Sequence, residues 1–398
     1  MNRLVFWGSA ATIAWTLAGF PLVAWLRGRL LHRPISRRSI TPHVTVIVAA
    51  FNEERVIGAK VANILGLDYP ADRVECIVVS DGSADKTVDV ARRSGSDEAR
   101  RVVVLDLPRR GKASAITAAA ARATGEILVF SDANSMLDRD ALRHLVAPFA
   151  DPSVGGVAGD QRYVDDPRAG KHGSERGYWS FERLLKHWES LAGSTVSATG
   201  ALHAIRARYF RPVPAGHTDD FTISTSVIRQ GARLVFEPRA IAREPVAETT
   251  SDEFSRKVRV ATRILYTELG SRDLFDVRRH GFYAIQLASH KPMRQLMFVP
   301  LILIAAVTPS LQARGWIYRL AAVGQAIVYG LGLVGLVLGD GRVGARKWLE
   351  LPAYVCMAYA AQAVAAGRVL SGRRVAMWGH TREIAMAERP ASKDGGRR

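Results

Sequence analysis

The sequence predicts an α/β domain with a mostly parallel β-sheet, attached to apolar helices that cross a membrane. Two observations predict the sheet: short runs rich in β-branched residues alternate with helical stretches, and each run is continuously apolar, as in strands buried on both faces. A third observation predicts the membrane helices, because long uncharged apolar segments lie near both ends of the chain. A chain of 398 residues has room for two or three such units.

The first apolar segment predicts an uncleaved membrane anchor over residues 1–30. Residues 4–26 carry no charge, and this stretch is longer than the apolar core of a cleaved signal peptide. Several arginines follow directly, and short loops rich in Lys and Arg stay on the cytoplasmic side of a membrane. We therefore expect the middle of the chain to be cytosolic.

Three later apolar segments predict C-terminal transmembrane helices within residues 293–372. They cover residues 296–311, 317–338 and 349–370. Four spans would place the basic tail, residues 373–398, outside the cytosol, against the preference of arginine for the cytosolic side. One late segment is therefore expected to be re-entrant or interfacial. The side chains of Trp25, Trp316 and Trp348 are expected to anchor span ends at the membrane interface.

The charge of the chain favours a membrane partner over nucleic acid. The net charge is +18, and the basic residues concentrate beside the apolar segments, where each contributes about 1 kcal/mol of attraction to anionic lipid. The sequence has no zinc finger, no RNP-like segment and no basic helix interleaved with aromatic residues. Two distant cysteines cannot form a disulfide framework or a four-ligand zinc site.

Polar residues follow each predicted strand of the sheet, and ligands of open parallel sheets bind beyond these strand ends. The strands are expected at residues 44–50, 75–80, 101–107 and 126–132. The residues that follow them are Asn52 and Glu53, Asp81, Arg109 to Lys112, and Asp132 to Asn134. No strand is followed by a Gly-rich dinucleotide fingerprint or a P-loop, which argues against oxidoreductases and P-loop ATPases. A nucleotide bound here would need carboxylates and a metal for its diphosphate.

Taken together, these strand ends resemble the family 2 glycosyltransferases over residues 44–263. The segment VIVAAFNEERVI resembles the opening strand and turn of the family, and VVSDGSADKT resembles its nucleotide-binding stretch. The resemblance implies a GT-A fold, with a Rossmann-like mixed sheet, over residues 41–250, followed by interfacial helices over 251–292. It also implies that Asn52, Glu53 and Asp81 bind a UDP- or GDP-sugar, although Ser80 replaces the family's first Asp.

The next two motifs concern the diphosphate and a metal. RRGKASAIT resembles the family's loop near the diphosphate, with Lys112 at the basic position; a solvated basic turn is the alternative. FSDAN resembles the D-x-D motif, which implies that Asp132 and Asn134 hold Mg²⁺ or Mn²⁺ on the donor phosphates. Hard cations take oxygen ligands, so one carboxylate with the phosphates suffices. The uncharged Asn134 is expected to lower metal affinity.

HTDDF resembles the T-E-D turn of the family, which implies that Asp220 is the catalytic base and that Asp219 lies beside the acceptor. Adjacent carboxylates at a helix start are commonly plain capping residues, so that alternative stays open. The flanking segments STVSATGALHAIR and RQGARLVFEPRA resemble the family pattern and favour the catalytic interpretation. Tyr178 and Trp179, with Glu182, are candidates for the acceptor cleft or for the core. His203 and His217 are expected to be structural.

The segment SDEFSRKVRVATRIL resembles the Q-x-x-R-W helix of processive synthases, but only Arg259 matches. This arginine would pair with the departing diphosphate or lie on anionic lipid. Val260 occupies the place of the Trp that holds a polymer end, which argues against chain extrusion.

The resemblance implies an inverting glycosyltransferase that modifies a lipid-linked or cell-envelope glycan acceptor at the cytosolic face of the plasma (inner) membrane, in a multi-pass protein. Two alternatives stay open. One is a processive polysaccharide synthase with a translocation channel, which product length would reveal. The other is a membrane scaffold that kept the fold and lost turnover.

Overall fold

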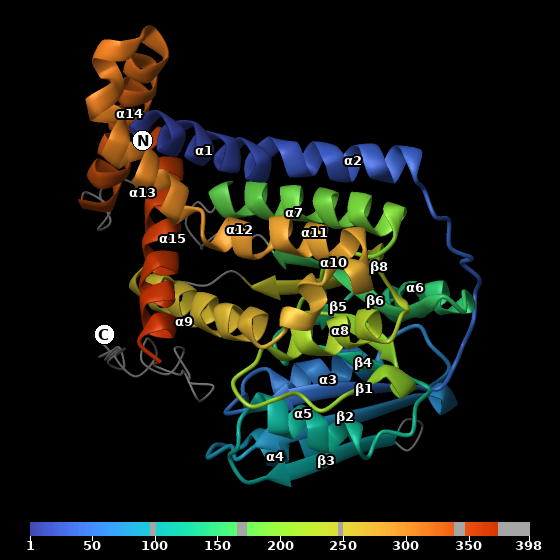
Figure 1. Cartoon of the computed structure of the whole chain (residues 1–398). Coiled ribbons are helices and arrows are strands. Elements are labelled where there is room, and N and C mark those ends of the chain that lie inside the picture. The colour runs from blue at the N-terminus through green and yellow to red at the C-terminus, as the bar shows by residue number, and fades with distance from the viewer. Residues whose placement is uncertain (96–100, 165–172, 246–249, 338–346, 373–398) are drawn as a thin grey trace, which may run out of the picture.

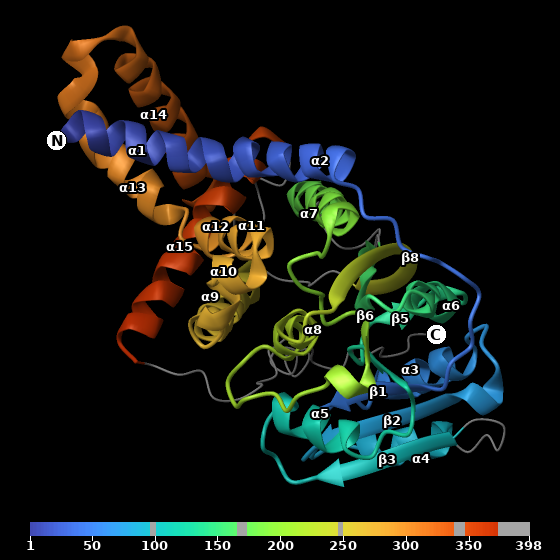
Figure 2. The same cartoon turned by 45° about the vertical axis from the view of Figure 1, so that its right-hand side comes forward.

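The computed structural model describes residues 1–95, 101–164, 173–245, 250–337 and 347–372. An α/β domain occupies one end of the molecule (Figure 1). The apolar helices from the two ends of the chain lie at the opposite end of the molecule. The helices within residues 250–295 lie between these two parts (Figures 1 and 2). The expected order of α/β domain and apolar helices is therefore present.

The described residues form an eight-stranded mixed sheet in the order β3-β2-β1-β4-β7-β6-β8-β5. The strands are β1 (Val44–Ala50), β2 (Val74–Asp81), β3 (Arg101–Leu107), β4 (Ile127–Phe130), β5 (Met136–Leu137), β6 (Val154–Val164), β7 (His203–Arg206) and β8 (Arg233–Pro245). Strands β1 to β4 pair in parallel, and β7 runs antiparallel to both β4 and β6. The carboxyl ends of β1, β2, β3 and β4 therefore meet at one edge, as the sequence predicted.

Helices cover both faces of the sheet, because successive residues of each strand point to opposite sides. Val46 and Val48 of β1 pack with helices α3 (Ile57–Leu65) and α6 (Ala141–Val146). Ile47 of the same strand packs on the other face, with α5 (Lys112–Ala120) and α8 (Asp219–Arg229). The short α4 (Thr87–Ser94) contacts α3 and β3. Helices α5 and α8 consequently begin near the polar strand ends.

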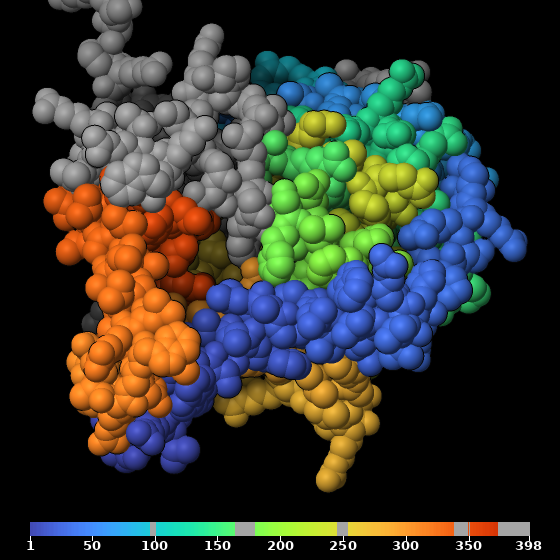
Figure 3. All heavy atoms as spheres, turned by 90° about the horizontal axis from the view of Figure 1, so that it is seen from above, coloured from blue at the N-terminus to red at the C-terminus, as the bar shows by residue number. Residues whose placement is uncertain are grey.

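The N-terminal segment is one long helix, made of α1 (Asn2–Ala14), a π-helical turn (Trp15–Gly19) and α2 (Phe20–Leu30). Its second half, α2, lies along α7 (Gly173–Ala192), as seen from above in Figure 3. The remaining helices are α9 (Thr250–Leu269), α10 (Val277–His280), α11 (Phe282–His290), α12 (Pro292–Gln295), α13 (Phe298–Val307), α14 (Trp316–Val337) and α15 (Lys347–Leu370). Helix α15 packs against both α9 and α14.

Three helices of the described chain are long and apolar enough to cross a membrane: Asn2–Leu30, Trp316–Val337 and Leu351–Leu370. They coincide with three of the four expected spans. The expected span at residues 296–311 is not one straight helix, because α13 ends at Val307 and a 3₁₀ helix containing Pro309 follows. Together with the preceding helices it forms a pair bent by 60°, a broken span or re-entrant loop. The tail at 373–398 and the Trp348 side chain lie outside the described residues.

Candidate functional site

The loops after β1 and β2 are joined by backbone-to-side-chain hydrogen bonds. Asn52 has a left-handed backbone (φ 52°), which Asn tolerates, and its Oδ1 accepts the N–H of Ala84 at 2.8 Å. The N–H of Glu53 donates to the hydroxyl of Thr87 at 2.7 Å. The two predicted donor-binding residues therefore lie on one rim above the sheet.

Asp81, at the end of β2, forms hydrogen bonds to the loop after β3. Its side chain is 2% exposed, and its Oδ1 accepts the N–H of Arg110 at 2.8 Å and that of Gly111 at 2.9 Å. Gly111 has φ 95°, a conformation that glycine adopts without strain. In this structure Asp81 thus positions the start of α5, and with it Lys112.

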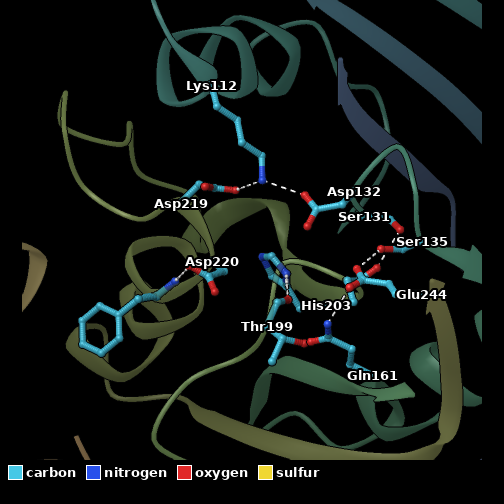
Figure 4. A network of polar contacts seen from close by, with 12 residues as sticks. Lys112, Ser131, Asp132, Ser135, Gln161, Thr199, His203, Asp219, Asp220 and Glu244 are labelled. Atoms are coloured by element: carbon cyan, nitrogen blue, oxygen red, sulfur yellow. Dashed lines mark hydrogen bonds and ion pairs between the residues drawn. The ribbon is translucent and has the colours of Figure 1, made fainter. Parts of the chain in front are cut away.

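Lys112 lies at the centre of the site, between two carboxylates (Figure 4). Its Nζ is 2.7 Å from Asp132 Oδ1 and 2.9 Å from Asp219 Oδ2. Burial alone would lower the pKa of Lys112, but the two carboxylates outweigh burial and raise the pKa above its usual value. The alternative of a solvated basic turn is therefore wrong: the side chain connects the residues expected at the metal and at the acceptor.

The turn that carries Asp132 is supported from beneath by a buried polar network (Figure 4). Lys60 Nζ donates to Ser131 Oγ at 2.7 Å and also to the backbone carbonyl of Ser135. The hydroxyl of Ser135 bonds to Glu244. Burial lowers the pKa of Lys60 to about 8. Sequence reasoning missed this support, because Lys60 lies on a helix whose other inward residues are apolar.

Gly200 lies beside the Asp132 carboxylate, and its lack of a side chain leaves space for that carboxylate. A Cβ at position 200 would lie 2.6 Å from Asp132 Oδ2, closer than real Cβ contacts allow. The backbone conformation at position 200 does not require glycine, so the effect of a larger residue there is on the position of this carboxylate. Any larger residue there must displace Asp132.

The donor set at this turn fits a hard divalent cation. Asp132 and the half-buried Asn134 offer oxygen atoms, and the Lys112 ammonium shows that positive charge is stabilised beside Asp132. Among the described residues, no group of three or more His, Cys, Asp or Glu side chains could hold a metal ion without other ligands. Mg²⁺ or Mn²⁺ would therefore need the phosphates of a substrate to complete its coordination.

Asp219 and Asp220 are the first two residues of α8. The pKa of Asp219 is lowered and that of Asp220 is raised. Burial favours the neutral form of Asp219, but the Lys112 ion pair outweighs burial and lowers the pKa. Burial, and then the charge of Asp219, raise the pKa of Asp220. The Oδ1 of Asp220 accepts the N–H of Phe221 at 2.8 Å. Two carboxylates with diverging pKa values suit two different roles, and Asp220 is the better proton acceptor.

His203, expected to be structural, lies within the same network (Figure 4). Its ring stacks on Phe130 with centroids 5.0 Å apart, and its Nδ1 is 3.0 Å from the carbonyl of Thr199. A carbonyl only accepts, so Nδ1 carries the hydrogen and Nε2 is an acceptor. Within the described residues the buried Nε2 has no partner. Burial is the main cause that lowers the pKa of His203 to about 4, which keeps the ring neutral at pH 7.

Helix α9 brings Arg263 to the site, whereas the predicted Arg259 on the same helix does not line the cavity beside Lys112. Arg263 lines a cavity of about 440 Å³ together with Arg110 and Lys112. Its guanidinium also donates to the carbonyl of His217 at 3.2 Å. Burial and the neighbouring Arg263 lower the pKa of Arg259. Sequence reasoning stopped at Arg259, although residues four apart share a helix face.

The predicted acceptor residues Tyr178 and Trp179 belong to α7, but their side chains lie outside the described residues. Glu182, one turn further along, is buried and accepts hydrogen bonds from His290 and Arg294. The suggestion that Glu182 lines an open cleft is therefore wrong, since its carboxylate is used inside the protein.

Comparison with known proteins identifies a described family for part of this chain. The family described as "Glycosyl transferase family 2" matches residues 45–213, the segment that supplies most of these strand ends. Residues 45–213 form a family 2 glycosyltransferase domain. The predicted resemblance, the GT-A fold and the class of enzyme are thereby confirmed.

Relatives of this glycosyltransferase include bacterial synthases. The poly-beta-1,6-N-acetyl-D-glucosamine synthase of Staphylococcus aureus (strain COL) is 24% identical over 311 residues, 76% of this chain and 74% of that protein. The synthase of the same name from Staphylococcus epidermidis is 24% identical over 268 residues, 65% of this chain and 64% of that protein.

A solved structure also matches this glycosyltransferase over nearly its whole length. The mannosyltransferase PcManGT from Pyrobaculum calidifontis, in complex with GDP-Man and Mn²⁺, superposes with a TM-score of 0.69 and 26% identity. The match covers 94% of this chain and 100% of PcManGT. The GT-A fold and the helices around it are therefore shared.

Proposed function

We propose that this glycosyltransferase transfers a sugar, with inversion, from a UDP- or GDP-sugar to a lipid-linked or cell-envelope glycan acceptor. One observation carries the proposal: Lys112 contacts Asp132, at the expected metal position, and Asp219, which adjoins the candidate base Asp220. Donor and acceptor sides of the reaction thus meet at one ammonium group.

In this mechanism Asp220 accepts the proton of an acceptor hydroxyl while that oxygen attacks the anomeric carbon. The bond between this carbon and the diphosphate oxygen breaks, and the nucleoside diphosphate leaves with the bonding electrons. General-base assistance of this kind contributes about 10² to 10⁴ in rate. The raised pKa of Asp220 supports this assignment. Lys112 and the arginines Arg259 and Arg263 stabilise the charge of the leaving group.

Mg²⁺ or Mn²⁺ belongs to the proposal as a cofactor held by Asp132, Asn134 and the donor phosphates. A bound divalent cation would supply positive charge to the departing diphosphate. The oxygen donors of the turn support this assignment, and PcManGT is named as a complex with GDP-Man and Mn²⁺. Asn52, Glu53 and Asp81 complete the proposed donor site, directly or by positioning its loops.

The membrane placement rests on exposed apolar surface. Helix α14 exposes large apolar side chains along its length, for example Leu320, Ile327 and Leu333, which water would solvate poorly. With the arginines after the first span, this surface supports a multi-pass protein of the plasma membrane whose catalytic domain faces the cytosol. The acceptor would then be reached at the membrane surface.

A second candidate function, processive polysaccharide synthesis, is favoured by similarity to the two staphylococcal proteins named as poly-N-acetylglucosamine synthases. Val260, at the position of the polymer-holding Trp, weighs against it. Product length separates the two: one added sugar supports single transfer, whereas a ladder of products supports a processive synthase.

The experiment is release of nucleoside diphosphate by detergent-purified protein, with a panel of UDP- and GDP-sugars, with Mg²⁺, Mn²⁺ or chelator, and with membrane lipid extract as acceptor source. The proposal predicts release from one donor that needs the metal and is lost in Asp132→Ala. Release that is unchanged by chelator would contradict the metal assignment. No release from any donor, with lipid present, would favour the scaffold interpretation.

A further inference from the structure

The segment that carries the proposed metal ligands alternates between buried and partly exposed residues. Ser131, Ala133 and Ser135 are buried, whereas Asp132 and Asn134 between them are half-buried. The two serine side chains therefore face the protein interior, and the two oxygen donors face away from it. Any contact that fixes the serines also fixes the direction of the oxygen donors.

One buried ammonium group holds both serines. Lys60 of α3 is 0% exposed, and its Nζ donates to Ser131 Oγ at 2.7 Å and to the backbone carbonyl of Ser135. An ammonium group only donates hydrogen bonds, so the Ser131 oxygen is the acceptor in this contact. The two serines directly precede and follow residues 132–134. A single side chain therefore holds both ends of this turn.

The two serines connect the buried ammonium to other parts of the site. The Ser131 hydroxyl donates to the carbonyl of Ala201 at 2.7 Å, and Ala201 directly follows Gly200 beside the proposed metal ligand. The Ser135 hydroxyl bonds to the buried carboxylate of Glu244, on strand β8 (Figure 4). The charge of Glu244 offsets that of the ammonium. The position of the turn is thus set by one connected, buried network.

Burial of Lys60 has a cost that an apolar residue at the same place would avoid. The other inward residues of α3 are apolar, namely Ile57, Val61 and Ile64. A buried ammonium loses its hydration, and an apolar side chain of similar volume is often neutral or stabilising in such a place. The hydrogen bonds that offset this cost go to the two ends of one turn. Stability of the helix therefore does not account for the lysine, whereas the position of the turn does.

We propose that Lys60 is a positioning residue for the divalent cation and the diphosphate of the donor. By holding Ser131 and Ser135, it keeps the oxygen atoms of the turn between them directed away from the interior, toward the place where these groups bind. The inference rests on the proposed function, which assigns Mg²⁺ or Mn²⁺ and the donor phosphates to Asp132 and Asn134. Outer contacts that orient metal ligands contribute about 10- to 100-fold to metal affinity. Lys60 acts through the turn and touches neither the cation nor the substrate.

The test measures binding of UDP and of GDP to full-length protein in neutral detergent, once with saturating Mn²⁺ and once with chelator. The ratio of the two dissociation constants is the gain in nucleotide affinity that Mn²⁺ provides. The inference predicts that Lys60→Met reduces this gain about tenfold or more and leaves the affinity in chelator unchanged. The same change removes a positive charge beside the turn, which by itself would strengthen cation binding. A reduced gain therefore identifies lost geometry, and an unchanged or larger gain would overturn the inference.

A second variant keeps the inference testable if Lys60→Met does not fold. Ser131→Ala removes one contact of Lys60 together with the link to Ala201, so it should reduce the Mn²⁺ gain about threefold or more. An unchanged gain in Ser131→Ala would then overturn the inference.

A control variant separates positioning from loss of stability. Thr45→Val removes a buried hydroxyl that bonds to Glu75 at 2.7 Å, near the amino end of β1 and at the opposite end of the sheet from the turn. Thermal unfolding is recorded for every variant. Thr45→Val should lower the Tm and leave the Mn²⁺ gain unchanged. A loss of the gain as large in Thr45→Val as in Lys60→Met would show general destabilisation and overturn the inference.

Failure of this inference is distinguishable from failure of the proposed function. Metal-dependent release of nucleoside diphosphate that Lys60→Met retains in full would keep the glycosyl transfer and remove the positioning role. A Mn²⁺ gain that Lys60→Met loses, without turnover of any donor by the wild type, would keep the positioning role and remove the transfer. Equal affinity of the wild type for both nucleotides with Mn²⁺ and with chelator would overturn the inference together with the metal assignment.

Discussion

Lys112 Nζ lies 2.9 Å from Asp219 Oδ2, and this ion pair joins the loop after β3 to the first turn of α8. The same ammonium holds Asp132 at 2.7 Å, so three segments distant in sequence meet at one charge. Under the proposed function, a diphosphate bound beside Lys112 would compete with Asp219 for this ammonium. We therefore expect donor binding to be coupled to the carboxylate next to the proposed base.

Replacing Lys112 with Met should weaken transition-state stabilisation of the leaving diphosphate. Charged hydrogen bonds contribute about 1.5 to 3 kcal/mol, so we expect kcat/KM for the donor to fall about 10- to 100-fold. The measurement is the rate of nucleoside diphosphate release against donor concentration. Arg122→Met removes an exposed cation just beyond the C-terminal end of α5 and serves as the control. Equal rates for Lys112→Met and wild type would contradict the central place of this ammonium.

Gly200→Ala should reduce activity through displacement of Asp132. The added methyl would lie 2.6 Å from Asp132 Oδ2, and a misplacement of about 1 Å costs on the order of 10²-fold in rate. Gly193→Ala is the matched control, since a Cβ there meets nothing within 4 Å. Turnover and its dependence on Mn²⁺ concentration are measured for both variants. Full activity of Gly200→Ala would show that this site tolerates movement of Asp132.

Asp219→Asn should shift the acid limb of the pH profile to lower pH. The base must be ionised to accept a proton, so activity falls as pH falls through the pKa of Asp220, which lies above its ordinary value of 3.8. The charge of Asp219 is one cause of that elevation. Removing this charge lowers the pKa of Asp220. The measurement is kcat/KM against pH for both proteins, and an unmoved limb would show that another group sets it.

His290→Ala should destabilise the protein, because it leaves Glu182 and Glu189 buried without the cation between them. Removal of one partner from a buried ion pair costs on the order of 3 kcal/mol in the free energy of unfolding. Equilibrium denaturation in detergent measures the change. His144→Ala, which removes a partly exposed helix-surface contact to Asp140, should cost less than about 1 kcal/mol. Similar losses of unfolding free energy for both variants would show that the buried contacts of His290 with Glu182 and Glu189 contribute no more than an exposed pair.

The first four strands and the polar residues at their ends were predictable, because the sequence carries local signals for them. Continuous apolar runs ending in polar residues indicated parallel strands, and their ends placed Asn52, Asp81 and Asp132 at one edge. The pair Asp219 and Asp220 was found from its helix-start motif. These features depend on residues close together in the chain, so the apolar pattern and the family resemblance were sufficient to predict them.

The partners of these residues were not predictable, because they depend on packing between distant elements. The contacts of Lys112 with Asp219 and of His290 with Glu182 join residues about a hundred positions apart. Nothing in the local sequence distinguishes Lys60 or Lys186 from exposed lysines on amphipathic helices. Only the fold shows that both are buried.

The most direct test of the account is turnover by Asp220→Asn beside Asp89→Asn, a matched change at an exposed aspartate of α4. Both proteins are assayed with the identified donor and acceptor, and the anomeric configuration of the wild-type product is determined by NMR. The account predicts an inverted product, a loss of about 10²-fold or more in kcat for Asp220→Asn, and wild-type rates for Asp89→Asn. Wild-type turnover by Asp220→Asn, or a product that retains the donor configuration, would contradict it.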